Sequence, residues 1–242
     1  MRNAVSTDPT VPPSRRRFVT QLGRIASLTA LGSIISARSI AAAEPDAPKV
    51  PETPDTPAPG DWDLSWVDRL KGATNRGVFD WSTMETPPDA AALDRAARYL
   101  DGCVDAYGDA SSARAVIVIR HLATPAALSD AAWSRYGIGA VEKVTDPATG
   151  QPAARNPFWS SASAGADESP TLHDLVQRGA IILACNVALT HLASRVARQR
   201  GEDPASVQHA FRASLVPTAI AVPSGIFGLV RAQNAGCGLI PA

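Results

Sequence analysis

The chain has 242 residues, of which 45% are hydrophobic and 19% charged, and its 23 basic residues balance 23 acidic ones. A chain of this length and composition can bury a hydrophobic core, which excludes a fibrous or wholly disordered protein. Zero net charge gives no strongly basic nucleic-acid surface, and three cysteines without a Cys-x-x-Cys pair form neither a disulfide framework nor a complete zinc site. We therefore expect no nucleic-acid partner, no metal and no cofactor.

Residues 1–43 have the pattern of an export signal. Residues 14–19 read SRRRFV, a moderately apolar stretch follows from 22 to 40, and residues 41–43 are three alanines. This order predicts a twin-arginine signal peptide, transport by the twin-arginine export machinery and a periplasmic protein, with a retained anchor as the alternative. Polar residues and glycines interrupt the apolar stretch, so we expect no stable membrane span.

A proline-rich tract, EPDAPKVPETPDTPAPG, occupies residues 44–60. Five of its prolines stand three residues apart, which is the repeat of a polyproline II helix. The tract has one large apolar residue, Val50, and therefore predicts an extended, solvated linker rather than part of a core. A recognition tract is the alternative, and the folded domain is expected at 61–242.

Apolar runs of strand length alternate with segments of helical period in the domain. The runs predict five strands, at 77–79, 115–119, 180–184, 216–222 and 237–240. The segments between them predict helices at 89–107, 129–136, 171–178, 187–200, after Asp203, and at 224–234. This alternation predicts a three-layer α/β fold, with about five mainly parallel strands and helices on both faces of the sheet.

A long loop is expected at about 140–169. It contains DPATG, then Phe158 and Trp159, then a stretch rich in serine, alanine and glycine. Loops of this length are often functional, and the two aromatic residues favour a lid over a site. A surface excursion without a role is the alternative.

Ligands bind beyond the carboxyl ends of the strands in an open parallel sheet. The sequence places polar or reactive residues at four such ends: Asp80, then Arg120 and His121, then Cys185 and Asn186, and finally Ser224 and Gly225. We take the last six of these as the candidate site, with Cys185 as the reactive residue.

Cys185 ends an apolar run and directly precedes a helix that Asn186 is expected to cap. A helix start favours the thiolate, which is the nucleophilic form of cysteine. The alternative is a small buried side chain, the better interpretation for Cys103 and Cys237. Either Arg120 or His121 could supply a positive charge near Cys185, because adjacent strand residues face opposite ways.

Ser224 and Gly225 begin the last helix. Their backbone N–H groups could bind an anion, although an ordinary helix cap is the simpler interpretation.

Two segments resemble the DsrE/DsrF-like family of sulfur-metabolism proteins. They are LVQRGAIILACNVAL at 175–189 and VPSGIFGLVRAQNAGCGLIPA at 222–242. The resemblance, to an exported branch of that family, implies a five-stranded, mainly parallel sheet, assembly into oligomers, and a cysteine at position 185 that carries sulfur as a persulfide. The export signal, the linker and the long loop lie outside it.

Two hypotheses about function follow. The first is a periplasmic DsrE-like protein that handles a small sulfur species, thiol or anion through Cys185. The second is a non-enzymatic module that binds a small ligand or partner subunits, with Cys185 merely packed. A homo-oligomer is expected from the resemblance and from the apolar residues Trp62, Trp66 and Trp81 near the start of the domain.

Overall fold

The computed structural model describes residues 56–85, 90–159 and 169–241. The expected signal peptide and most of the proline-rich tract, up to residue 55, lie outside these ranges, as do residues 160–168 of the expected loop. Within the described ranges, no helix combines the length and the hydropathy needed to span a membrane.

Five parallel strands form one sheet in the order β4-β3-β2-β1-β5. The strands are β1 (Asn75–Trp81), β2 (Ala113–Ile119), β3 (Ile181–Cys185), β4 (Ile220–Val222) and β5 (Gly238–Pro241). All of β3 and nearly all of β2 are buried, which explains why their sequences are apolar without alternation. The predicted α/β architecture is therefore confirmed.

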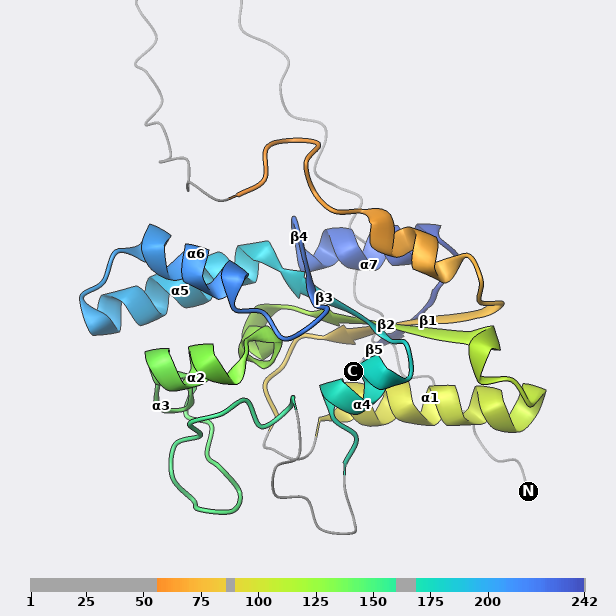
Figure 1. Ribbon diagram of the computed structural model, residues 1–242, viewed down its shortest axis with the longest axis horizontal. Helices are drawn as coiled ribbons and strands as arrows, with labels where there is room; N and C mark the ends of the chain where they lie inside the picture. Colours follow the sequence, from red (N-terminus) through yellow and green to blue (C-terminus); the bar gives the residue numbers. More distant parts are fainter. Residues whose placement is uncertain (1–55, 86–89, 160–168, 242) are drawn as a thin grey trace, which may run out of the picture. The chain divides into compact units, whose positions relative to one another are not determined.

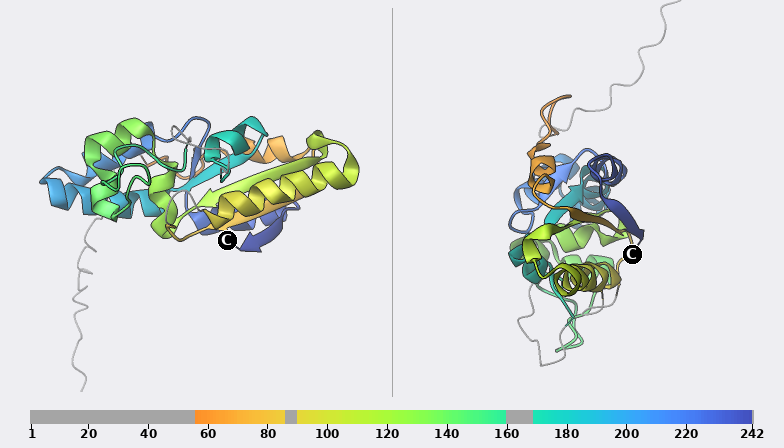
Figure 2. Two further views of the ribbon diagram at one scale, coloured as in Figure 1. Left: turned by 90° about the horizontal axis from the view of Figure 1, so that it is seen from below. Right: turned by 90° about the vertical axis from the view of Figure 1, so that its right-hand side faces the viewer.

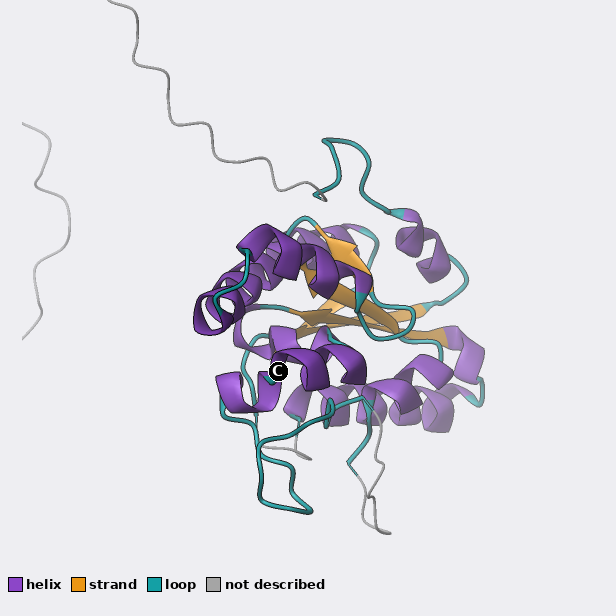
Figure 3. Cartoon of the chain, turned by 60° about the vertical axis from the view of Figure 1, so that its left-hand side comes forward, coloured by secondary structure: helices purple, strands orange, loops and turns teal. Residues whose placement is uncertain are grey.

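Helices cover both faces of the sheet (Figure 1). The α1 and α4 helices lie on one side, and η1 and α7 lie on the other, which the end-on view of Figure 2 also shows. Figure 3 shows helices on both sides of the strands. The helices are η1 (Ser65–Leu70), α1 (Ala91–Tyr107), η2 (Ala110–Ser112), η3 (His121–Ala127), α2 (Asp130–Tyr136), α3 (Ile138–Glu142), α4 (Leu172–Gln177), α5 (Asn186–Arg200), α6 (Pro204–Ala213) and α7 (Gly225–Asn234).

Alternate residues of the strands divide the buried side chains into two cores. Phe79, Ile117 and Ile182 belong to the core that contains α1, whereas Val78 and Val116 belong to the core beneath η1 and α7. This division follows from the two-residue period of a strand, which sends neighbouring side chains to opposite faces.

Local sequence signals explain where several helices begin and end. Thr171 and Asp174 form a reciprocal capping box at the start of α4. Asp203 caps α6, and Pro204 occupies its first turn. Gly108 and Gly201 end α1 and α5 in the left-handed conformation, both with φ of 68°.

The strand predicted at 216–222 forms only over its last three residues. Val216 lies outside the strand, and Thr218 has a φ of 68°, which is incompatible with extended strand backbone. The β-branched residues between positions 216 and 222 favoured the prediction of a longer strand. The turn at Thr218 prevents the first part of this segment from joining it.

The segment expected as a loop contains more structure than its sequence suggested. It begins with α3, and an isolated bridge joins Thr145 to Pro152. Phe158 is buried, with its ring centroid 5.3 Å from that of Trp81 in an edge-to-face arrangement. Phe158 therefore belongs to the core, which removes it as evidence for a lid.

The tryptophans on which the expectation of a homo-oligomer partly rests are mostly internal. Trp66 and Trp81 are fully buried, and Trp62 is half-buried beneath the guanidinium of Arg212, 5.2 Å from the ring centroid. Trp66 and Trp81 therefore fill the protein interior and do not support the expected homo-oligomer, which stays a prediction.

Candidate functional site

The candidate site lies where β1 to β4 end side by side. Asp80 pairs in register with Val118 near the end of β1 and β2, and Cys185 pairs with Val222 at the end of β3 and β4. Parallel strands bring these positions to one edge of the sheet, which is where ligands bind in open α/β folds. We call this the carboxyl edge.

Arg120 forms a two-pronged ion pair with Asp80 at this edge. Its Nε lies 2.6 Å from Asp80 Oδ1, and its Nη2 lies 2.7 Å from Oδ2. The hydrogen bonds donated to Asp80 raise the pKa of Arg120, and the nearby Cys185 makes a smaller contribution in the same direction. The Arg120 guanidinium is therefore fixed in orientation and lies within electrostatic reach of the Cys185 sulfur.

Gly225 lets the start of α7 approach Arg120 closely. A Cβ atom at position 225 would lie 2.6 Å from Arg120 Cβ and 2.8 Å from Arg120 Cδ. Only a glycine fits here without displacing the arginine, so Gly225 is required for packing at the carboxyl edge.

Cys185 itself is the N-cap of α5. Its Sγ accepts a hydrogen bond from the backbone N–H of Ala188 at 3.4 Å, and the residue is 6% exposed. The expectation that Asn186 caps this helix was wrong, because Asn186 is already its first helical residue. The sulfur has taken the place of the usual capping oxygen.

Asn186 uses its polar groups within the protein. Its Oδ1 accepts a hydrogen bond from Arg212 Nη1 at 2.7 Å, and its backbone carbonyl accepts one from the Thr190 hydroxyl at 3.0 Å. Asn186 is buried at the start of α5. Because Arg212 lies in α6, the hydrogen bond between the two side chains connects these helices.

Arg120 and His121 have different environments. His121 is exposed and has a φ of 54°, and its carbonyl accepts a hydrogen bond from the Thr124 hydroxyl. Its imidazole makes no hydrogen bond or ion pair with a residue in the described ranges. The charge of Arg120, by contrast, acts on Cys185.

Ser224 acts as the cap of α7. Its Oγ accepts a hydrogen bond from the backbone N–H of Phe227 at 3.1 Å. The simpler of the two interpretations, an ordinary N-cap, accounts for this contact.

Sequence reasoning placed Asp80 at the carboxyl edge but gave it no role. The signal was an acidic residue at the end of one predicted strand and a basic residue, Arg120, at the end of another. The strand order and register that make them partners became visible only in the structure.

Exposed apolar side chains surround the same edge. Leu122, Val187 and Ile226 are 47%, 48% and 57% exposed, and each lies just after one of the strands β2, β3 and β4. These three residues, the apolar rim, add unpartnered hydrophobic area next to the candidate site.

The comparisons with known proteins found a similar solved structure but no matching family model or curated protein. Among solved structures, the chain is similar to a protein of unknown function from Methanobacterium thermoautotrophicum, with 17% sequence identity and a TM-score of 0.33. The similarity covers 69% of this chain and 99% of the other.

Proposed function

We propose that the protein binds and transfers a small sulfur species at Cys185. The observation that carries the proposal is the surroundings of its sulfur atom, which accepts a backbone N–H at a helix start and lies within electrostatic reach of Arg120. An N–H donor, a helix N-terminus and a cation are each groups that stabilise an anionic sulfur species bound or formed at this position. The resemblance to the DsrE/DsrF-like family supports the same choice of residue.

The reaction is written with thiosulfate as donor. The Cys185 thiolate attacks the outer sulfur, a new S–S bond forms to the Sγ atom, and the bond between the two thiosulfate sulfurs breaks. Sulfite leaves with the electron pair, and a persulfide anion remains on Cys185. Charge and atoms balance without another oxidant or reductant.

Arg120 and Asp80 have separate roles in this proposal. The guanidinium attracts the anionic donor and stabilises the persulfide anion, whereas Asp80 keeps the guanidinium in one orientation through two hydrogen bonds. Cys185 is 6% exposed, so the donor must be small enough to approach a nearly buried sulfur.

The proposed location is the periplasm, reached through the twin-arginine pathway. The supporting feature is the order of twin arginines, apolar stretch and small residues in the sequence. An oxidising compartment exposes a persulfide to further oxidation, and burial of Cys185 limits that exposure.

A second candidate function is an interaction module in which Cys185 is structural and partner subunits cover the carboxyl edge. The apolar rim and the low exposure of the sulfur favour it. A homo-oligomer is the proposed form of either function, and light scattering on the purified protein tests it.

Intact mass spectrometry distinguishes the two functions. The protein is incubated with thiosulfate or polysulfide, and the sulfur-transfer function gives an increase of about 32 Da, one sulfur atom, that dithiothreitol removes. The gain should vanish in Cys185→Ser and persist in the matched controls Cys103→Ser and Cys237→Ser. No gain in the wild type, or an unchanged gain in Cys185→Ser, contradicts sulfur transfer at this residue.

A further inference from the structure

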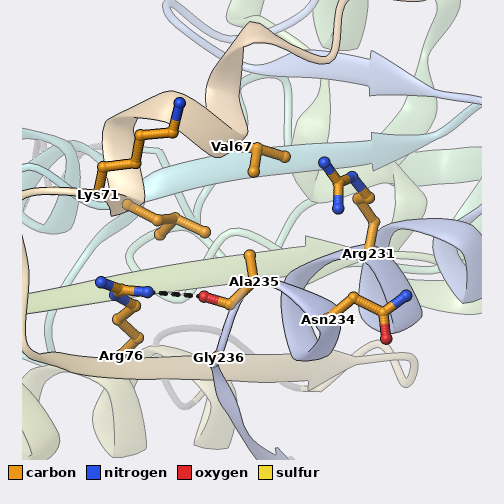
Figure 4. Close-up of a pocket in the computed structure, with 8 residues that line it drawn as sticks. Val67, Lys71, Arg76, Arg231, Asn234, Ala235 and Gly236 are labelled. Atoms are coloured by element: carbon orange, nitrogen blue, oxygen red, sulfur yellow. Dashed lines mark hydrogen bonds between the residues drawn. The ribbon is translucent and has the colours of Figure 1, made fainter.

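A separate cavity of about 500 Å³, open to solvent, lies at the opposite end of β1 from the candidate site. It is bounded by η1, by the start of β1 and by the last turn of α7 (Figure 4). Its lining includes Val67, Leu70, Lys71, Arg76, Arg231 and Asn234. Its volume falls within the range of small-molecule sites, which is roughly 300–1,000 Å³. We call it the amino-end cavity.

The charged side chains that line this cavity are all basic. They are Lys71, Arg76 and Arg231, and the lining contains no carboxylate. Lys71 pairs at 2.6 Å with Asp68, and both of these side chains are largely exposed. The two arginines therefore carry the positive charge that a ligand would meet.

Arg76 is held in place by the backbone. Its Nε donates to the carbonyl of Ala73 at 2.6 Å, and its Nη1 donates to the carbonyl of Ala235 at 2.8 Å (Figure 4). These bonds leave the Nη2 donors of the guanidinium available. The bond from Nη1 also engages the Ala235 carbonyl, which lies just beyond the end of α7 and would otherwise repel an anion.

Arg231 reaches into the cavity from α7. Figure 4 shows its guanidinium extending toward Val67, on the other side of the cavity from Arg76. Within the described ranges it forms no ion pair and donates no side-chain hydrogen bond. A half-buried guanidinium without a partner is a strong donor for an oxyanion.

We propose that the amino-end cavity binds a small organic oxyanion, in the form of a phosphate monoester or a sulfonate. Arg231 and the free donors of Arg76 bind the anionic head, and the partly exposed aliphatic side chain of Val67 contacts its apolar body. The site uses no residue of the carboxyl edge, so it is independent of sulfur transfer at Cys185.

Isothermal titration calorimetry on the full chain tests the site with three probes: phenyl phosphate, benzenesulfonate and inorganic phosphate. Phenyl phosphate should bind more tightly than inorganic phosphate, and added salt should weaken its binding. Arg231→Met should weaken it at least about tenfold, because it removes charge-assisted hydrogen bonds. Arg198→Met is the matched control, since Arg198 also lies in the last turn of a helix, and it should leave the affinity unchanged.

A second readout uses the unmodified protein. Cys237 follows the cavity residue Gly236 and is close enough to Arg76 for that charge to act on its thiol. Phenyl phosphate should slow alkylation of Cys237 and leave Cys185 unaffected. Tighter binding of inorganic phosphate, an equal loss in Arg231→Met and Arg198→Met, or no heat with any probe would each overturn the proposal.

Discussion

At the carboxyl edge Arg120 is paired with Asp80, whereas at the amino-end cavity Arg231 has no acidic residue in the surrounding lining. At the first end these groups are engaged within the fold: the Cys185 sulfur caps α5, and Gly225 lets α7 pack against Arg120. At the second end it leaves a cavity. A charged group that is already paired within the fold has fewer hydrogen-bond donors left for a ligand than an unpaired one. Mutations at the two ends test this difference.

The largest expected effect is on stability at the carboxyl edge. Phe158→Ala should lower the free energy of unfolding by about 3–5 kcal/mol, because it removes a buried ring packed on Trp81 and leaves a void. Chemical denaturation measures the loss. The control is Leu239→Ala in β5, where the side chain is 45% exposed and the change should be small. An equal loss in Leu239→Ala would contradict the assignment of Phe158 to the core.

Gly225→Ala should destabilise the protein by about 1–3 kcal/mol, because the new Cβ collides with the stem of Arg120. Thermal unfolding provides the measurement. Gly102→Ala is the matched control within α1, where an added Cβ has no atom within 4 Å and alanine favours the helix. A variant at position 225 as stable as the wild type would mean that α7 can shift away from Arg120.

Asp80→Asn should lower the unfolding free energy by about 1–2 kcal/mol, because it leaves the partly buried guanidinium of Arg120 with a neutral partner. The control, Asp94→Asn, removes a more exposed pair with Arg98 and should leave the denaturation midpoint unchanged. In mass spectrometry, Asp80→Asn should also reduce persulfide yield without abolishing it. An unchanged yield would assign Asp80 a purely structural role.

The smallest effect compares two thiols of equal exposure. Cys185 and Cys237 are each 6% exposed, which makes them the best-matched pair of thiols for comparing alkylation rates. Burial raises the pKa of Cys237, and Arg76 offsets part of that rise, so at neutral pH this thiol is almost wholly protonated. Cys185 should react several-fold faster with iodoacetamide, as peptide mapping would show. A faster Cys237 would reverse the assignment of the reactive cysteine.

The linkage of Cys237 to stability has a defined sign. Its folded-state pKa is raised, so the folded protein retains this proton to a higher pH than the unfolded chain does. The resulting stabilisation is complete below the pKa of the unfolded thiol and is lost as the pH rises through the folded-state value. Cys237→Ala should therefore reduce the decline in stability at alkaline pH, as denaturation at a series of pH values would measure.

The sheet was predictable because its strongest signals are local. The apolar runs that became β2 and β3 are of strand length and rich in β-branched residues, which favours strands covered on both faces, and glycines and prolines marked most helix ends. The position of Cys185 at the carboxyl edge followed from the same pattern. Local signals could not indicate the turn at Thr218, which shortens β4, or the helix α3 within the expected loop.

The details of both sites depend on contacts between distant residues. The pairing of Arg120 with Asp80 requires β1 and β2 to be neighbours in a given register, and the amino-end cavity requires the end of α7 to lie over β1. Asn186 was expected at a cap and instead bonds to Arg212, because the sulfur one residue earlier already occupies that position. Composition and spacing carry little information about such tertiary contacts.

The pairing of β1 with β5 joins Gly77 to Gly238 across nearly the whole domain. Closing so long a loop has a high entropic cost, so this pair should form late during folding. It also lies at an edge, with three of the four β5 residues exposed. Backbone amides of β5 should therefore exchange with deuterium well before those of β2, and fraying of this strand opens that edge of the sheet.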